Sequence, residues 1–288
     1  MHRFILHNDE IHDASHKLLS PGQVGLLSGW GVFTTIKVTG GVLFAFERHW
    51  ARMSRDAALM RVQLPADPAR LEDSLLRLVK KNNASLSTLR VNVVRNKGGI
   101  FEGPDITRPS DVIAFTADIT NWGKSVKLDY VPQARHAASA FAGTKILAWG
   151  MNLTMLEDAK SKGFDEVVLL NERGEVAECT SANIFAAKNG EVWTPPLSSG
   201  CLPGITRELL LSDVRVAGVP VSERVLTPAD LESADEVFIS STTRELLSVS
   251  MIGNRPIQNS GQAREALQTA FSKYMDEYIA SHKGQFAH

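Results

Sequence analysis

The sequence contains little cysteine and no excess of charge of either sign. Its 288 residues include two cysteines, Cys179 and Cys201, which cannot build a disulfide framework and match no zinc-site spacing. There are 31 Lys and Arg residues against 32 Asp and Glu residues, so no basic excess is available to bind nucleic acid. We therefore expect a reduced, cytoplasmic protein with no metal and no nucleic-acid partner.

Long apolar runs are also missing. No stretch approaches the roughly 20 apolar residues that a membrane helix needs. Residues 1–7 (MHRFILH) lack the apolar segment and cleavage site of a signal peptide. The 43% apolar and 22% charged content is ordinary for a globular protein, so we expect no membrane partner.

The length predicts two domains, and a polar segment, TNWGK at 120–124, marks the boundary between them. Apolar alternation and helical periodicity predict the elements before this segment. They are strands at 4–7, 31–38, 42–46, 88–95 and 111–117 and helices at 48–60 and 68–81. We expect a small N-terminal α/β domain at 1–119 and a linker at 120–125.

The remaining elements predict a larger domain at 126–288 with a mixed sheet. They are helices at 147–162, 206–218 and 262–281 and strands at 126–131, 166–170, 175–178, 184–187, 191–194, 220–225, 236–240 and 247–251. This order is neither a regular βαβ alternation nor all-β. The predicted fold class is therefore α+β.

Lys145 and Glu178 are two charged residues next to apolar segments. Lys145 lies in AGTKILAWGM (142–151), where burial would lower its pKa and favour a nucleophilic amine. The alternative is a lysine that extends its amine to solvent from a helix start. Glu178 ends an apolar strand; it is either solvated or paired, or held against a protonated ring nitrogen.

Two segments resemble anion-binding turns. Gly204–Arg207 opens a helix after Pro203, and Ser240–Arg244 follows an apolar strand. Free N–H groups, the helix dipole and hydroxyl groups favour an anion at such places. Ordinary capping of the helix by Thr or Ser remains the commoner explanation.

Five stretches, taken together and in order, resemble the class IV aminotransferases, the fold-type IV family of pyridoxal 5′-phosphate (PLP) enzymes. The family includes branched-chain aminotransferases, D-amino-acid aminotransferases and aminodeoxychorismate lyases. The stretches are GWGVFTTIKV (29–38), HWARM (49–53), TKILAWGMN (144–152), GFDEVVLLNERGEVAECTSANIFAAKNGEVWTPPLSSGCLPGITR (163–207) and DEVFISSTTRELLSVSMIG (235–253). The resemblance implies a two-domain fold-type IV enzyme that forms a homodimer.

The resemblance also implies roles for individual residues. Lys145 matches the Schiff-base lysine, which later moves the proton, and Glu178 matches the carboxylate that pairs with the pyridine nitrogen. The matches to the phosphate-binding residues are Arg52, Ile205, Thr206 and Thr242. On this assignment the first domain supplies Arg52 and part of the substrate pocket, and the second supplies Lys145, Glu178 and the other phosphate contacts.

Departures from the family patterns bear on the substrate. Thr34-Thr35 after Phe33 resembles the lyases, whereas Trp149-Gly150 resembles the (R)-selective amine transaminases. The segment TPPL…LPGITR resembles the branched-chain group, and the carboxylate trap of the D-amino-acid enzymes is missing. Arg90 is a candidate carboxylate binder or an exposed strand arginine. Phe33, Arg90 and Trp149 are therefore candidates for the substrate pocket.

The leading hypothesis is a PLP-dependent transaminase of amino-acid metabolism. It would move an amino group from a hydrophobic, branched-chain L-amino acid to 2-oxoglutarate. Alternatives on the same fold are aminodeoxychorismate lyase, which forms 4-aminobenzoate and pyruvate, and an (R)-selective amine transaminase. A non-catalytic binding protein is disfavoured because Lys145, Glu178 and Arg52 are all present.

Overall fold

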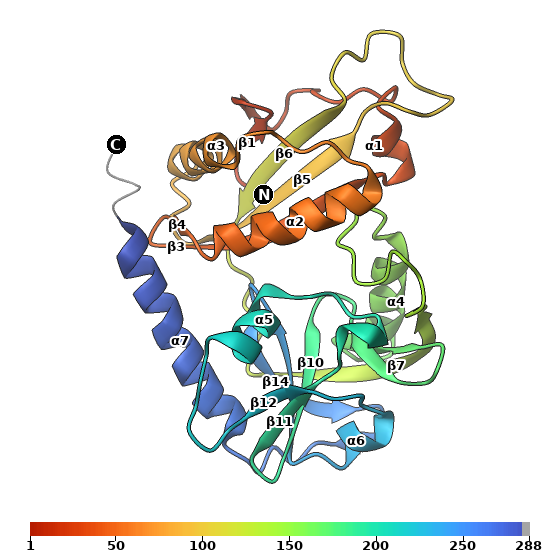
Figure 1. Ribbon diagram of the computed structural model, residues 1–288, viewed down its shortest axis with the longest axis vertical. Helices are drawn as coiled ribbons and strands as arrows, with labels where there is room; N and C mark the ends of the chain where they lie inside the picture. The colour runs from red at the N-terminus through yellow and green to blue at the C-terminus, as the bar shows by residue number, and fades with distance from the viewer. Residues whose placement is uncertain (284–288) are drawn as a thin grey trace. The chain divides into compact units, whose positions relative to one another are not determined.

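A computed structural model describes residues 1–283 of the chain (Figure 1). The chain forms two compact units. The first contains residues 1–120, residues 145–149 and the described residues from 276 onward, and the second contains residues 121–144 and 150–275. Residues 284–288, the end of the second predicted domain, lie outside the described residues.

The first unit is built on a six-stranded antiparallel sheet in the order β2-β1-β6-β5-β3-β4. Its strands are β1 (Phe4–His7), β2 (Glu10–Asp13), β3 (Gly31–Thr39), β4 (Val42–Leu43), β5 (Ser87–Arg95) and β6 (Ser110–Ala117). In the register of β3 and β5, Phe33 lies opposite Asn92 and Thr35 opposite Arg90. Side chains alternate across a strand, so these four share one face and Thr34 points to the other.

The helices of the first unit are α1 (Val24–Ser28), α2 (Phe46–Met60) and α3 (Pro68–Lys81). The Asp67 carboxylate starts α3 by accepting hydrogen bonds from the backbone N–H groups of Ala69 and Arg70. Apolar side chains of α2 and α3, including Met53 and Leu75, share a buried core with Ile36 and Leu89 of the sheet. The predicted 68–81 helix is confirmed with the same bounds.

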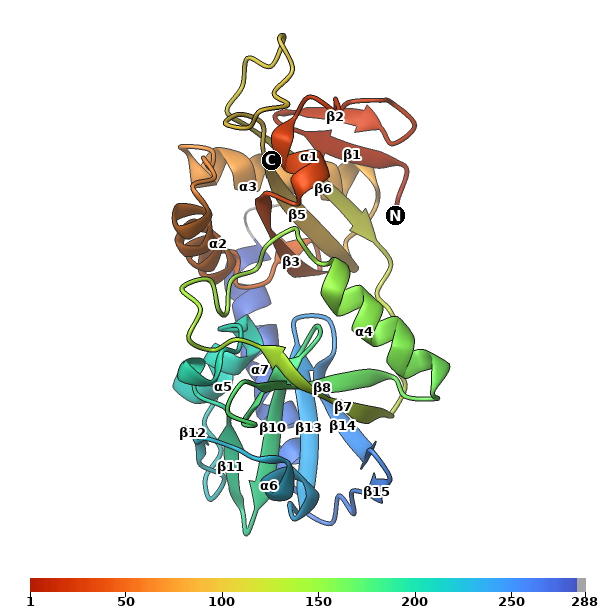
Figure 2. The same ribbon diagram turned by 90° about the vertical axis from the view of Figure 1, so that its right-hand side faces the viewer.

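The second unit contains a nine-stranded mixed sheet in the order β12-β11-β10-β13-β14-β7-β8-β9, with β15 beside β14. Its strands are β7 (Ser125–Arg135), β8 (Glu166–Asn171), β9 (Val176–Cys179), β10 (Asn183–Lys188), β11 (Glu191–Thr194), β12 (Val221–Glu223), β13 (Glu236–Ser241), β14 (Glu245–Ile252) and β15 (Arg255–Pro256). Figure 2 shows β10, β13 and β14 side by side in this sheet. The pairs β11–β12, β14–β7 and β7–β8 are parallel.

The remaining helices are α4 (Gly150–Ser161), a 3₁₀ turn at Leu197–Ser199, α5 (Ile205–Ser212), α6 (Pro228–Glu232) and α7 (Ala263–His282). The α+β prediction is confirmed, because both sheets are accompanied by helices and neither shows regular βαβ alternation. None of the helices within residues 1–283 has the length and apolar character needed to cross a membrane.

Three predicted elements differ from the structure, two of them for identifiable reasons. The 42–46 strand is cut to Val42–Leu43 because α2 begins at Phe46, after Ala45 with a positive φ of 54°. The 206–218 helix ends at Ser212. The 147–162 helix begins only at Gly150, because the segment before it pairs with β3. For the same reason Lys145–Trp149 clusters with the first unit, although the sequence placed these residues in the second domain.

Removing Leu75 tests the core of the first unit. Leu75 is fully buried on α3, so Leu75→Ala is expected to lower the free energy of unfolding by about 2–5 kcal/mol. Leu86 is 61% exposed, and Leu86→Ala is the matched control, with an expected change of no more than about 0.5 kcal/mol. Urea denaturation followed by circular dichroism measures both, and equal losses would contradict this core.

Candidate functional site

The backbone around Lys145 is held against β3. Phe33 N–H donates to the Lys145 carbonyl at 3.0 Å, and Leu147 N–H donates to the Gly31 carbonyl at 3.0 Å. An isolated bridge pairs Val32 with Ile146 between these two bonds. Gly31 permits the close approach, since a Cβ there would collide with the Leu147 side chain and the Val93 carbonyl.

Asp56 of α2 fixes the same segment from another side. Its Oδ2 accepts a 3.0 Å hydrogen bond from the backbone N–H of Lys145, and Arg55 Nε donates to its Oδ1 at 2.9 Å. Asp56 is 1% exposed, so its carboxylate is shielded from water and depends on donors within the protein for its hydrogen bonds. The sequence analysis missed Asp56; its one available signal is its position one helical turn after Arg52.

Two aromatic rings surround the Lys145 amine. Its Nζ lies 4.4 Å from the Phe33 ring centroid and 5.1 Å from that of Trp149. The two rings pack edge to face, with centroids 5.4 Å apart and an interplanar angle of 87°. The first unit therefore brings three sequence-predicted residues together, with the amine against ring faces that favour a cation.

Arg90 belongs to the same group. Its guanidinium carbon lies 3.4 Å from the Phe33 ring centroid, and its Nε donates to Asn92 Oδ1 at 3.1 Å. Burial lowers the pKa of Arg90 to about 10, which leaves it cationic at neutral pH. Arg90 and Asn92, two residues apart on β5, share one face of the strand.

Arg52 lies on the buried side of α2 with His49 one turn before it. Arg52 Nη2 donates to Thr34 Oγ1 at 3.0 Å, and the same hydroxyl lies 2.7 Å from His49 Nδ1. Burial, followed by the nearby Arg52 and Lys145 charges, holds the pKa of His49 well below its usual range. A neutral histidine and a hydroxyl thus surround a guanidinium.

Glu178 of β9 anchors the second group, which lies wholly in the second unit. Its Oε1 accepts a 3.0 Å hydrogen bond from Arg135 Nε, and its Oε2 accepts one of 3.0 Å from the backbone N–H of Leu202. Asn152 Oδ1 lies 3.3 Å from both terminal nitrogens of Arg135. Sequence reasoning missed Arg135 and Asn152, since no local signal links β7 to β9.

The start of α5 has backbone donors that no side chain caps. Gly204 is the N-cap and makes no side-chain capping bond, and Ile205 and Thr206 behind it are buried. Asn183 Nδ2 donates to the Leu202 carbonyl at 2.8 Å, and a Cβ at Gly204 would collide with the Asn183 side chain. Asn183 and Gly204 therefore shape a helix start suited to an anion.

The second predicted anion-binding segment is a turn between two strands. β13 ends at Ser241 and β14 begins at Glu245, so Thr242 lies in the hairpin turn. Arg244 in this turn donates to the Ser181 carbonyl at 3.1 Å, and its Nη2 lies 3.5 Å from Glu166 Oε2. These contacts fix the turn that carries Thr242.

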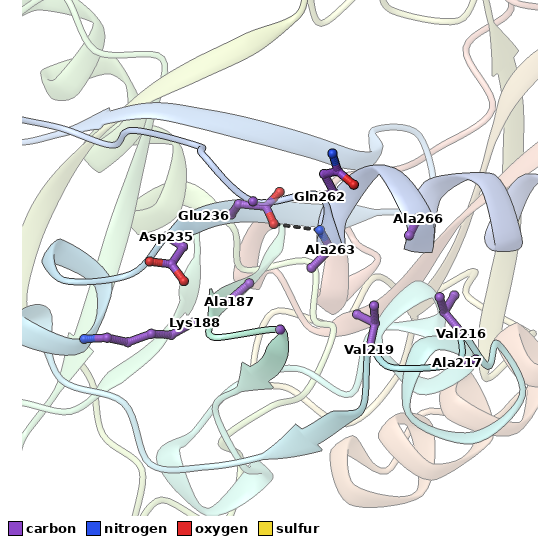
Figure 3. Close-up of a pocket in the computed structure, with 12 residues that line it drawn as sticks. Ala187, Lys188, Val216, Ala217, Val219, Asp235, Glu236, Gln262, Ala263 and Ala266 are labelled. Atoms are coloured by element: carbon purple, nitrogen blue, oxygen red, sulfur yellow. Dashed lines mark hydrogen bonds between the residues drawn. The ribbon is translucent and has the colours of Figure 1, made fainter.

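A separate hollow of about 270 Å³ in the second unit contains none of the predicted site residues (Figure 3). Glu236 lies beside it and caps α7, with its Oε1 accepting from Ala263 N–H at 2.8 Å and its Oε2 from Arg264 N–H at 3.3 Å. The carboxylate thus satisfies two of the N–H donors of this helix start.

Neither the cysteines nor a metal cluster offers other chemistry in residues 1–283. Both thiols are buried, and burial raises the pKa of Cys201 to about 12 and that of Cys179 well above its usual value. No group of three or more His, Cys, Asp or Glu in this part of the chain could hold a metal ion.

The comparisons with known proteins point to one family. The sequence model of the family described as "Amino-transferase class IV" matches residues 31–252. A putative branched-chain-amino-acid aminotransferase of Methanocaldococcus jannaschii is 28% identical over 285 residues, covering 93% of this chain and 94% of that protein. A D-alanine aminotransferase of Bacillus licheniformis is 28% identical over 293 residues, with 92% and 95% covered.

Two solved structures share the fold. The Escherichia coli branched-chain amino acid aminotransferase has a TM-score of 0.87 at 23% identity, covering 96% of this chain and 95% of that one. A putative 4-amino-4-deoxychorismate lyase from Legionella pneumophila has a TM-score of 0.83 at 22% identity, covering 90% and 96%.

Asp56 is expected to hold the Lys145 backbone in place. Asp56→Ala removes the acceptor and should raise amide hydrogen exchange at residues 145–147 by about tenfold or more, since a hydrogen bond to a charged group is lost. Asp56→Asn keeps a carbonyl oxygen and should change exchange far less. Exchange by mass spectrometry that is unchanged in Asp56→Ala would contradict the role.

Proposed function

Because the chain belongs to the class IV aminotransferase family, we propose that it moves the amino group of a branched-chain L-amino acid to 2-oxoglutarate. Members of this family use PLP, and the family match together with the aminotransferase relatives makes this chain a PLP-dependent transaminase. Its substrates are accordingly a small amino donor and an oxo-acid acceptor. The observation that carries the proposal is the Lys145 amine, anchored through its backbone and set against two aromatic rings.

The residues of each unit fit the chemical groups of the cofactor. A pyridinium N–H needs a carboxylate, and Glu178 is held in place by Arg135 and the Leu202 N–H. A phosphate needs cations and N–H donors; the first unit offers Arg52, and the second unit offers the start of α5 at Ile205 and Thr206. Thr242 adds a hydroxyl. When bound, PLP accepts electrons from the substrate carbon that loses its proton.

Lys145 is the proposed catalytic residue. Its Nζ would hold the cofactor and, once released by the substrate amine, would serve as the group that takes up and delivers the proton. Asp56 would limit the movement of the Lys145 backbone and so help to keep the amine in place for this proton transfer.

The proposed donor pocket combines an apolar surface with one cation. Phe33 and Trp149 offer ring surface to a hydrophobic side chain, and Arg90 offers a guanidinium to a carboxylate. This combination suits an enzyme that alternates between a branched-chain amino acid and 2-oxoglutarate. From the family resemblance, we also propose that the protein forms a homodimer and is located in the cytoplasm.

Aminodeoxychorismate lyase is the second candidate, favoured by Thr34-Thr35 after Phe33. The Thr34 hydroxyl, however, is engaged by His49 and Arg52, which leaves Thr35 on the face that Phe33 and Arg90 share. Parallel assays of glutamate formed from leucine and of pyruvate released from aminodeoxychorismate decide between them. Pyruvate without glutamate would replace the transaminase assignment by the lyase.

A panel of donors tests the remaining alternative. Leucine, isoleucine, valine, D-alanine and an (R)-amine are each assayed with 2-oxoglutarate and with pyruvate. We expect turnover of the branched-chain L-amino acids with 2-oxoglutarate. A preference for the (R)-amine would instead identify the protein as the (R)-selective amine transaminase that Trp149 suggests.

Lys145→Ala is expected to lose the absorption band of the bound cofactor and to lower kcat by a factor of at least about 10²–10⁴, because both covalent attachment and proton transfer are lost. Lys160 lies on the exposed part of α4, and Lys160→Ala is the control that should retain both band and rate. Visible absorption spectroscopy and steady-state kinetics provide the measurements. A coloured, active Lys145→Ala protein would rule out the assignment.

Arg90→Gln is expected to raise KM for 2-oxoglutarate by about 10- to 100-fold, the range for a lost charge-assisted hydrogen bond. 2-Oxoglutarate has two carboxylates, whereas 4-methyl-2-oxopentanoate has only one. The ratio of the KM changes for these two acids therefore shows which carboxylate Arg90 binds. Unchanged KM values for both acids would show that Arg90 binds neither carboxylate and has a structural role.

A further inference from the structure

A buried chain of polar side chains connects β3 with α2. Thr34 and His49 are 1% and 0% exposed, and Arg52 is 8% exposed. Thr34 Oγ1 is the centre of the chain, 2.7 Å from His49 Nδ1 and 3.0 Å from Arg52 Nη2. Burying a hydroxyl and an imidazole is costly unless they are hydrogen-bonded, so this pairing is a constraint on both elements.

The direction of the hydrogen bonds follows from the chemistry of the three groups. Arginine can only donate, so Thr34 Oγ1 accepts from Arg52. The hydroxyl hydrogen can then be donated to His49 Nδ1, 2.7 Å away. This direction requires a neutral His49 with its proton on Nε2, which is buried and has no hydrogen-bond partner among the described residues. Its depressed pKa, caused by burial and by the charges of Arg52 and Lys145, agrees with this assignment.

The arrangement fixes where the guanidinium lies. Thr34 is held by the strand and His49 by the helix, so a hydroxyl oriented by His49 receives one N–H of Arg52 at a set position. A protonated His49 would instead donate toward the hydroxyl and place a second positive charge beside Arg52. The neutral acceptor thus leaves Arg52 as the cation of the group.

We propose that Thr34 and His49 are positioning residues that hold Arg52 for the cofactor phosphate. The inference rests on the proposed function, in which Arg52 binds that phosphate. It also assigns different roles to the two threonines of the GVFTT motif. Thr34 faces α2 and serves cofactor binding, whereas Thr35 lies on the face of Phe33 and Arg90.

The test compares two cofactor forms that differ only in the phosphate. The full-length apo protein is titrated with PLP and with pyridoxal, and equilibrium dissociation constants are measured by fluorescence. Thr34→Val keeps the side-chain shape but removes the hydroxyl, and should weaken PLP binding by about tenfold or more. Pyridoxal binding should change by less than about twofold, because it has no phosphate.

Two matched variants accompany it. Thr34→Ser restores the hydroxyl and should return PLP affinity to within about twofold of wild type. Thr35→Val removes the same group one residue along, on the opposite face of β3, and should leave the ratio of PLP to pyridoxal affinity unchanged. Equal weakening of both ligands by Thr34→Val, or no change in either, overturns the proposal.

The unaltered protein provides a second measurement that does not depend on the folding of a variant. Nitrogen-15 NMR of the His49 ring should show a neutral imidazole with its proton on Nε2. A proton on Nδ1 would overturn the hydrogen bond from the Thr34 hydroxyl to His49. The outcomes also separate the two claims. A wild-type protein that binds no PLP overturns the proposed function and this inference together, whereas PLP binding that is indifferent to Thr34→Val overturns only the positioning role.

Discussion

The hydrogen bonds between the Lys145–Leu147 backbone and β3 are the constraint on which the first unit's site depends. They place a lysine that is distant in sequence beside Phe33, and they require Gly31 because a side chain there would fill the space of Leu147. Asp56 adds a third bond to the same backbone. The position of the Lys145 backbone is therefore set by these three hydrogen bonds, and its amine lies against the Phe33 and Trp149 rings.

Helix α2 contributes the second constraint. His49, Arg52 and Asp56 follow one another at spacings of three and four residues, so one buried helix face presents all three. Asp56 fixes the lysine backbone, and His49 with Thr34 fixes the guanidinium. In the second unit, Arg135 and the Leu202 N–H hold Glu178, while Asn183 holds the Leu202 carbonyl two residues before the Gly204 cap of α5. The proposed ring-nitrogen partner and the proposed phosphate-binding helix start are thus linked through one residue, Leu202.

Local signals in the sequence predict an element correctly where the element's own residues determine where it begins and ends. The helix at 68–81 follows from Asp67, Pro68 and the leucine spacing, and its bounds are those observed. The predicted start of the 147–162 helix was wrong because tertiary pairing with β3 outweighs helical periodicity. Arg135 and Asp56 escaped notice for the same reason, since their partners lie 43 and 89 residues away. Thr34, read from the motif as a sign of lyase chemistry, has a role visible only once α2 packs on β3.

Chemical trapping shows whether Lys145 is the residue to which the cofactor is bonded. The PLP-loaded protein is reduced with sodium borohydride, digested and mapped by tandem mass spectrometry. We expect one pyridoxyl phosphate group per chain, on Lys145. A modified lysine elsewhere, or a loaded protein in which no lysine is modified, would contradict it.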